Sequence, residues 1–190
     1  MKSEETKQRI VDAGLAAFAE KGCRFTVDDL EKSLAMSRKT IYRHFSGKDA
    51  LLRAMLDTVY GEIHTQQHVI YADPSLSIPN RLRAILTVEN RGSALIRPDY
   101  LRGLQKHFPA VYDYFLQEYA TEWQPVEQLL RQGIEAGCYR ACNIPLVTAL
   151  LQNGMQMLCK DDLLERSGLC YQQALCEMVD LVLSGITVSA

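Results

Sequence analysis

A short basic segment near the amino end, SRKTIYRHFSGKDAL (residues 37–51), contains the residue types that recognise nucleic acid. Arginine and lysine donate hydrogen bonds to guanine O6 and N7, and the methyl group of threonine contacts thymine. Tyrosine, lysine and serine side chains also hold phosphate oxygens, which fixes the position of a protein on the duplex. The segment therefore favours a surface that binds an anionic polymer. A solvated, charged helix face is the alternative that this run of residues alone leaves open.

The candidate DNA-binding residues lie in this segment and at the start of the helix expected before it. We expect Arg38, Lys39 and Arg43 to face the base edges, while Tyr42 and Lys48 anchor phosphates. The whole set is Thr26, Ser37, Arg38, Lys39, Thr40, Tyr42, Arg43, His44 and Lys48.

Three helix starts surround the basic segment and would position it. Thr26 with Asp29 three residues later predicts a capped helix over about 27–34, Ser37 caps a helix that runs through Phe45, and Ser46 caps a longer one. Helix N-termini carry unpaired N–H groups that bind phosphate oxygens. A helix, a short helix, a tight turn and a short basic helix form the plan of a helix-turn-helix domain, which we expect over residues 1–48.

Helical periodicity continues through residues 49–190, and the alternation typical of strands is missing. After a turn-rich break at 71–80 we expect helices near 80–96, 99–107, 145–160 and 170–186, with a long helix over about 109–137 that Pro125 kinks. The fold class is therefore all-α, with about nine helices and a second, helical domain over 49–190.

Charge and composition limit the class of protein. Residues 1–53 contain 11 Lys/Arg and 8 Asp/Glu, whereas residues 54–190 contain 10 and 15, so the basic end is the one suited to phosphate. The absence of a membrane-length apolar run or a secretory signal predicts a cytoplasmic protein that does not enter a membrane. No catalytic motif such as GxSxG, HExxH or a phosphate-binding loop is present, which argues against an enzyme.

The stretch FTVDDLEKSLAMSRKTIYRHFSGKDALL (residues 25–52) resembles the DNA-binding signature of the TetR/AcrR family of bacterial transcriptional regulators. The likeness covers about residues 6–53 and includes the pattern S-x-x-T-[IL]-Y-x-H-F. Ala35 departs from it, because the family usually has glycine in this turn. The resemblance implies a homodimer that binds a palindromic double-stranded operator, acts by default as a repressor, needs no cofactor, and is released by a small-molecule effector of unknown identity.

An aromatic stripe and a histidine pair are the candidates for effector binding. Five aromatic residues are spaced 4, 3, 4 and 4 along the expected long helix, and His64 and His68 lie four apart on the helix that Ser46 caps. The candidate ligand-binding residues are Tyr60, His64, Asn90, Phe108, Tyr112, Phe115, Tyr119 and Trp123. Core packing explains such a stripe equally well. The two histidines lack a third ligand, so we expect no metal.

The last two expected helices carry apolar stripes suited to a dimer interface. The candidate interface residues are Leu146, Leu150, Gly154, Met157, Leu175, Met178 and Val182. A face turned toward the chain's own core is the alternative for each of them.

Two further functions stay open at this point. The first is a thiol-based redox-sensing regulator on the same scaffold, with Cys138, Cys142 or Cys159 as the responding group. The second is a helical protein-interaction module that uses the terminal helices and does not bind DNA.

Overall fold

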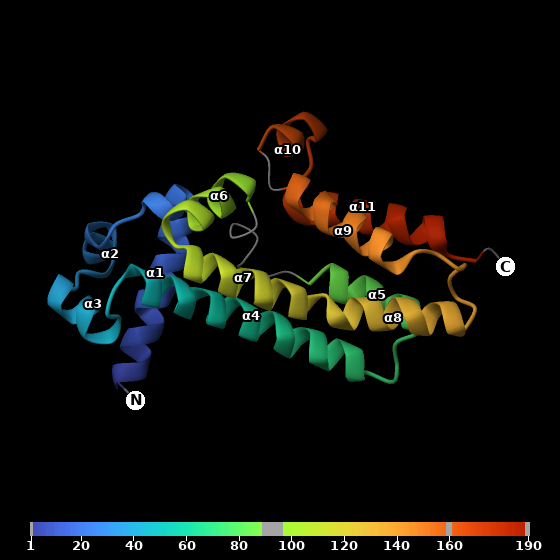
Figure 1. Cartoon of the computed structure of the whole chain (residues 1–190), viewed down its shortest axis with the longest axis horizontal. Coiled ribbons are helices and arrows are strands. Elements are labelled where there is room, and N and C mark those ends of the chain that lie inside the picture. Colours follow the sequence, from blue (N-terminus) through green and yellow to red (C-terminus); the bar gives the residue numbers. More distant parts are fainter. Residues whose placement is uncertain (1, 89–96, 159–160, 189–190) are drawn as a thin grey trace. The chain divides into compact units, whose positions relative to one another are not determined.

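The structure is a computed structural model that describes residues 2–88, 97–158 and 161–188 (Figure 1). The all-α prediction is confirmed, since every helix or strand assigned to these residues is helical apart from one isolated bridge between Tyr139 and Thr187. The described part of the chain contains eleven α-helices and one 3-10 helix, against about nine expected.

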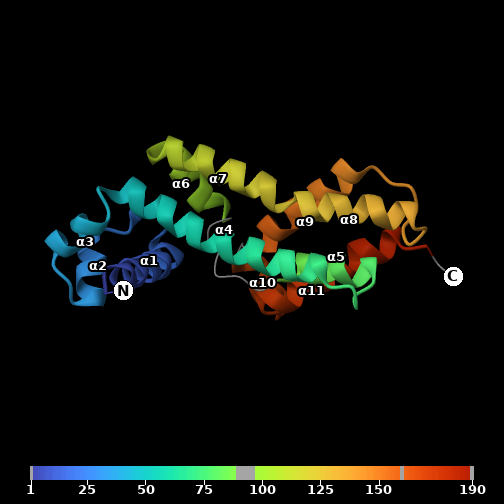
Figure 2. The ribbon, with the colours of Figure 1, turned by 90° about the horizontal axis from the view of Figure 1, so that it is seen from below.

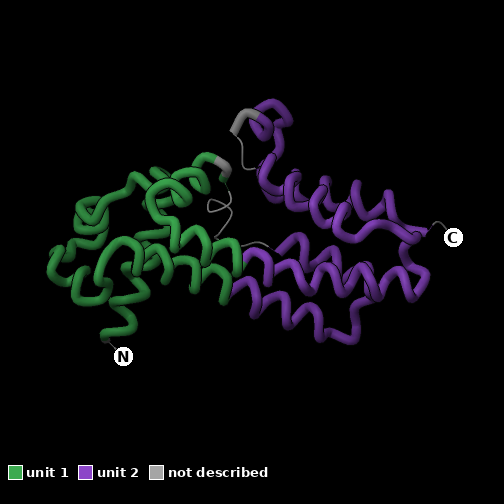
Figure 3. The backbone as a smooth tube through the Cα atoms, in the orientation of Figure 1, with its two compact units in different colours: residues 1–61, 91–118 green, residues 62–90, 119–190 purple. Residues whose placement is uncertain are grey.

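The chain forms two compact units (Figure 3). Unit 1 comprises Met1–Gly61 with Arg91–Glu118, and unit 2 comprises Glu62–Asn90 with Tyr119–Ala190. Two helices, α4 (Lys48–Ala72) and α7 (Pro109–Glu122), contribute residues to both units. The division expected at residue 48 coincides with the start of α4, whereas the units divide the chain within that helix.

Unit 1 begins with α1 (Lys2–Lys21), which ends directly before Gly22. Gly22 has φ +56°, and a Cβ at this position would lie 2.6 Å from the ring of Tyr100. Because only glycine adopts this backbone without strain and leaves room for the ring, it ends α1 and opens the 3-10 helix η1 (Gly22–Arg24).

The next two helices of unit 1 have the caps that the sequence predicts. Thr26 accepts from the Asp29 N–H at 3.3 Å, while the Thr26 N–H donates to the Asp29 carboxylate at 2.7 Å, so α2 (Val27–Leu34) begins with a capping box. Ser37 accepts from the Thr40 N–H at 3.2 Å and caps α3 (Arg38–His44). On the inner side of these helices, Leu30, Ile41 and Phe45 are buried.

The remaining helix of unit 1 is α6 (Pro98–His107), which packs against η1. The unit 1 portions of α4 and α7 share an aromatic contact, since the rings of Tyr60 and Phe115 lie 6.4 Å apart. The Tyr114 O–H also donates to Asp57 at 2.5 Å. These contacts join the two portions of α4 and α7 that belong to unit 1.

Unit 2 consists of helices packed around one apolar core. Helix α5 (Ile78–Leu86) lies beside α8 (Gln124–Glu135), and α9 (Ile144–Leu158) packs against both α8 and α11 (Tyr171–Ile186), as Figures 1 and 2 show. The helix expected over 109–137 is two helices, because the chain breaks at Trp123 and Pro125 opens α8. Helix α10 (Asp161–Ser167) was not expected.

A short link closes unit 2 after α8. A Cβ on Gly133 would lie 2.2 Å from the Tyr139 ring, so glycine is required for this close approach. Beyond it, Arg140 N–H donates to Ile186 O at 2.9 Å and Val188 N–H donates to Cys138 O at 3.1 Å. These bonds tie the end of α11 to the loop before α9.

No helix among residues 2–88, 97–158 and 161–188 combines the length and apolarity that a membrane span requires.

Candidate nucleic-acid interface and interior cavity

The exposed face of α3 brings together three of the predicted DNA-binding residues. Lys39, Tyr42 and Arg43 are exposed, with Tyr42 50% exposed, whereas Ile41 on the opposite side is buried. Their i, i+3, i+4 spacing places the three side chains on one side of the helix. The result is a solvated surface with two cations beside a phenol.

Arg38 lies at the start of the same helix but is held by carboxylates. Its guanidinium forms ion pairs with Asp28 and with Glu31, the latter at 3.2 Å, and its backbone N–H donates to Glu31 at 2.5 Å. Arg38 must therefore exchange these partners before it can donate to a base.

The predicted hydroxyl-bearing residues serve first as helix caps. The Thr26 O–H donates to Asp29 at 2.9 Å, and the hydroxyls of Ser37 and Thr40 lie 3.1 Å apart. The Lys21 ammonium and the Thr26 donors lower the pKa of Asp29 to about 2, so this carboxylate stays charged and keeps the cap. All three hydroxyls are thus fixed in position beside the first turns of α2 and α3.

The structure corrects the expectation that Lys48 anchors a phosphate. Its ammonium donates to Cys23 O at 2.6 Å and to Phe25 O at 2.5 Å, and it lies 4.3 Å from the centre of the Phe25 ring. Burial lowers the pKa of this lysine. Lys48 therefore joins the first turn of α4 to the segment before α2, instead of pointing to solvent.

The role expected for His44 also needs correction. Its Nε2 is buried and has no hydrogen-bond partner among the described residues. This atom is hidden from solvent, so it does not offer a contact to a base edge in this conformation.

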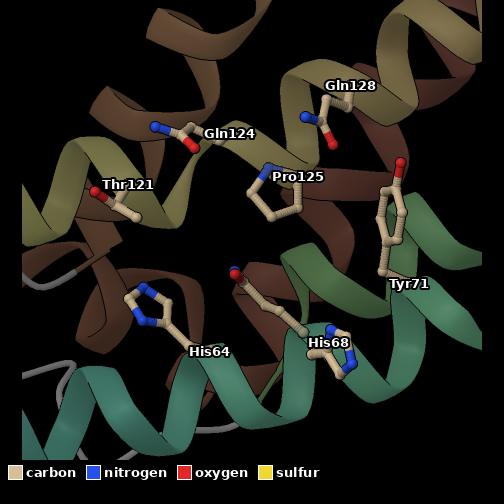
Figure 4. Close-up of a pocket in the computed structure, with 8 residues that line it drawn as sticks. His64, His68, Tyr71, Thr121, Gln124, Pro125 and Gln128 are labelled. Carbon is tan, nitrogen blue, oxygen red and sulfur yellow. The ribbon is translucent and has the colours of Figure 1, made fainter.

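A cavity of about 280 Å³, partly open to solvent, is lined by residues of unit 2 (Figure 4). One wall is a polar stripe on α4, made of His64, Gln67, His68 and Tyr71. The other wall is the end of α7 and the start of α8, with Thr121, Gln124, Pro125 and Gln128.

Two side chains of the α4 wall have unused hydrogen-bonding capacity. Gln67 is only 4% exposed, and its Oε1 has no partner among the described residues. The Tyr71 hydroxyl accepts from Gln132 Nε2 at 3.0 Å, which leaves its own O–H to donate elsewhere. The cavity thus offers hydrogen-bonding groups beside its apolar surface.

Only one predicted ligand-binding residue, His64, lines this cavity. Phe108 lines a different cavity of about 680 Å³ in unit 1, beside Cys23 and Tyr100. Asn90 lies outside the described residues. The sequence signal for the lining of this cavity was the i, i+3, i+4, i+7 spacing of the four polar residues on α4, and the aromatic stripe on the later helix was the more conspicuous pattern.

The aromatic stripe itself belongs mainly to the two cores, which corrects its assignment to ligand binding. Tyr60 and Phe115 are buried in unit 1, and Trp123 is buried in the core of unit 2. Tyr112 and Tyr119 are partly buried and pack against Phe115 and Trp123, at ring-centre distances of 6.2 Å in each case.

The expected dimer residues divide into exposed and internal groups. Leu146, Leu150 and Met157 are 60%, 57% and 51% exposed along α9. Leu175 is 3% exposed and belongs to the core of its own unit, so its assignment to an interface is wrong.

The other three expected dimer residues pack within unit 2. A Cβ on Gly154 would lie 2.3 Å from the sulfur of Met178, which shows that these two residues join α9 to α11 inside one chain. Val182 is partly buried against the same core. Leu181, which is 76% exposed on α11, was not expected.

The residues of the alternative chemistries have ordinary structural positions. Cys138 and Cys142 are free thiols that pack against the core of unit 2, and Cys159 lies outside the described residues. Within the part of the chain that the structure describes, no three His, Cys, Asp or Glu side chains are grouped as metal ligands.

Comparison with known proteins agrees with this geometry. Residues 10–55 match the family model described as bacterial regulatory proteins, tetR family. The HTH-type transcriptional regulator YvaF of Bacillus subtilis is 26% identical over 183 residues, which cover 95% of each chain.

Solved structures share the fold over nearly the whole length. The ketosteroid transcriptional regulator KstR2 of Mycobacterium tuberculosis is 21% identical with a TM-score of 0.72, covering 97% of this chain and 96% of that one. The transcriptional regulator FadR of Bacillus subtilis, solved in complex with stearoyl-CoA, is 16% identical with a TM-score of 0.66, covering 94% and 98%.

Proposed function

Because the chain belongs to the TetR family of DNA-binding, helix-turn-helix transcriptional regulators, we propose that it is an effector-controlled repressor that binds a palindromic operator as a homodimer. The observation that supports this best is the exposed Lys39–Tyr42–Arg43 face of α3, which is held on a domain with two capped helices. Regulators of this family are not enzymes. The protein would act in the cytoplasm, where it meets the chromosome.

In this proposal α3 enters the major groove. Lys39 and Arg43 donate to base edges or phosphates, and Tyr42 holds a phosphate through its hydroxyl. Arg38 joins them by exchanging Asp28 and Glu31 for the DNA, a swap favoured where phosphates raise the local negative potential. Ser37 and Thr40 hold the first turn of α3 in position next to the DNA.

A second copy of the chain is needed for specificity, because one seven-residue helix spans too few base pairs. The exposed leucines Leu146 and Leu150 and the exposed Met157 give α9 an apolar face, and Leu181 extends apolar surface to α11. We propose that the partner subunit covers this surface, so that two α3 helices address two half-sites.

Effector control is proposed through α4. This helix is continuous from Lys48, which is tied to the carbonyls of Cys23 and Phe25, to the cavity residues Gln67 and Tyr71. The distance along the helix from Lys48 to Gln67 is about 28 Å at a rise of about 1.5 Å per residue. A ligand that moves the cavity end would therefore move the first turn of α4 and, through Lys48, the start of α2. The FadR complex with stearoyl-CoA is an example of a small molecule bound on this fold.

Selection of bound fragments from random duplex DNA tests the DNA-binding part of the proposal. We expect a palindromic site, with base preferences that relax in Lys39→Ala and Arg43→Ala. Lys106→Ala is the matched control, because Lys106 is an exposed cation at the end of α6. Equal selectivity of the α3 variants and the control would contradict base reading by α3.

Sedimentation of Leu150→Glu tests the dimer. A charge on the exposed α9 face should convert the protein to a folded monomer and weaken operator binding. A glutamate at a buried position would instead unfold the chain. A dimer that persists in Leu150→Glu with normal operator affinity would exclude this face as the interface.

A further inference from the structure

Building on the effector control proposed above, we propose that the unit 2 cavity binds a small, uncharged ligand. This ligand donates a hydrogen bond to Gln67 Oε1 and accepts one from the Tyr71 hydroxyl. Primary amides and neutral heterocycles with adjacent N–H and C=O groups are the chemical class that meets both requirements.

The buried oxygen of Gln67 is the first support. This side chain is 4% exposed, lines the cavity, and its Oε1 has no partner among the described residues. A buried acceptor without a donor costs about 1–3 kcal/mol, and folded proteins leave few such atoms. An N–H or O–H of a ligand in the cavity removes that cost, so part of the binding free energy comes from satisfying Gln67.

The hydroxyl of Tyr71 supplies the complementary group. Gln132 Nε2 donates to this oxygen at 3.0 Å, which fixes the phenol and uses one of its acceptor positions. The single O–H donor remains, and Tyr71 is one helical turn beyond Gln67 on the same wall. One acceptor and one donor thus lie on the same wall of the cavity, one helical turn apart along α4, and an amide group offers a partner to each.

The charge of the lining sets the ligand's charge. Apart from the imidazoles of His64 and His68, neither wall contributes an acidic or basic side chain, since no lysine, arginine, aspartate or glutamate lines the cavity. A carboxylate or phosphate that enters would give up part of its hydration without meeting a lysine or arginine, which opposes its binding. Uncharged ligands avoid this cost.

The volume sets the ligand's size. About 280 Å³ is at the lower end of the range for small-molecule pockets, which are roughly 300–1,000 Å³. One ring or two fused rings fit this space, and Pro125 offers them an apolar surface on the α8 wall.

Isothermal titration of the full-length protein with matched pairs of probes tests the proposal. The pairs are benzamide with benzoate and naphthalene-2-carboxamide with 2-naphthoate, at pH 8, where free imidazole is neutral. We expect each amide to bind at least tenfold more tightly than its carboxylate. Equal or tighter binding of the carboxylates, or no heat of binding for either amide at its solubility limit, would overturn the proposal.

Two variants and a control connect the binding to the named atoms. Gln67→Leu should weaken naphthalene-2-carboxamide binding at least tenfold and also raise the melting temperature of the free protein, because it removes a buried unpaired acceptor. Tyr71→Phe should weaken the amide several-fold. Gln105→Leu, at an exposed position of α6, should leave binding unchanged. Undiminished binding in Gln67→Leu would refute the assignment.

Operator binding measured with the same probes separates this inference from the function it rests on. If the amides bind through Gln67 but leave operator affinity unchanged, the ligand class is supported and effector control through this cavity fails. If the carboxylates bind more tightly and release the operator, effector control is supported and the ligand class fails.

Discussion

Replacing Ala35 by glycine should stabilise the protein, because Ala35 has a left-handed backbone at the end of α2 (φ 51°, ψ 39°). This conformation costs an L-residue about 1–2 kcal/mol, whereas glycine adopts it freely. Glycine in turn gives the unfolded chain more freedom, which costs about 0.4–1 kcal/mol. Since the Ala35 side chain is exposed and its loss removes little packing, the net gain is about 0.5–1 kcal/mol.

Urea denaturation followed by far-UV circular dichroism measures this gain. For a chain of this length it corresponds to a rise in melting temperature of about 1–4 °C. Ala16→Gly is the matched control, because Ala16 is an exposed position inside α1, where glycine should cost about 1 kcal/mol. The two substitutions are chemically identical and should have opposite signs. Destabilisation by Ala35→Gly as large as that of Ala16→Gly would refute the left-handed turn between α2 and α3.

Three further predictions follow from charged groups. The double variant Asp28→Asn, Glu31→Gln should free Arg38 and tighten duplex DNA binding roughly three- to tenfold in fluorescence anisotropy at low salt; unchanged or weaker binding would show that the carboxylates do not compete with DNA. Lys48→Met should lower the free energy of unfolding in urea by about 1–3 kcal/mol, because two main-chain carbonyls lose their donor; unchanged stability would place the ammonium in solvent. Desolvation raises the pKa of the partly buried Glu122 from 4.5 to about 7, so the folded state binds more protons between these values and stability falls as pH rises through this window. Between pH 4.5 and 8 the parent protein should lose on the order of 1–3 kcal/mol of unfolding free energy, and Glu122→Gln should abolish this loss. An identical pH dependence of unfolding in variant and parent would contradict the raised pKa.

The helix-turn-helix could be predicted in detail because its signals are local. Thr26 and Asp29 are three residues apart, and the capping box they form requires only that spacing. Ser37 caps α3 through a bond to Thr40, again three residues away. The end of α1 at Gly22 depends on one residue's backbone freedom. The expectation of DNA binding came from these local signals together with the resemblance to the family signature.

The assignment of the long side chains could not be predicted in the same way. Lys48 is in a basic run and carries the charge of a phosphate anchor, yet its donors reach carbonyls 23 and 25 residues away in sequence. Trp123 and Phe115 fit a ligand pocket and a core equally well by spacing, and packing decided for the core. Leu175 and Leu150 belong to similar apolar stripes, but one is buried and the other is 57% exposed.

The amino-acid sequence by itself determined the all-α class, the caps of α2 and α3 and the basic character of the surface between them, because these properties depend on residues within one or two helical turns. Only the tertiary structure decided that Arg38 is paired with acidic residues, that Lys48 is internal and that Gln67 faces a cavity with an unused acceptor. Each of these depends on which distant segments meet. An amphipathic pattern predicts that one face of a helix will be buried, but which segment buries that face depends on packing across the whole unit.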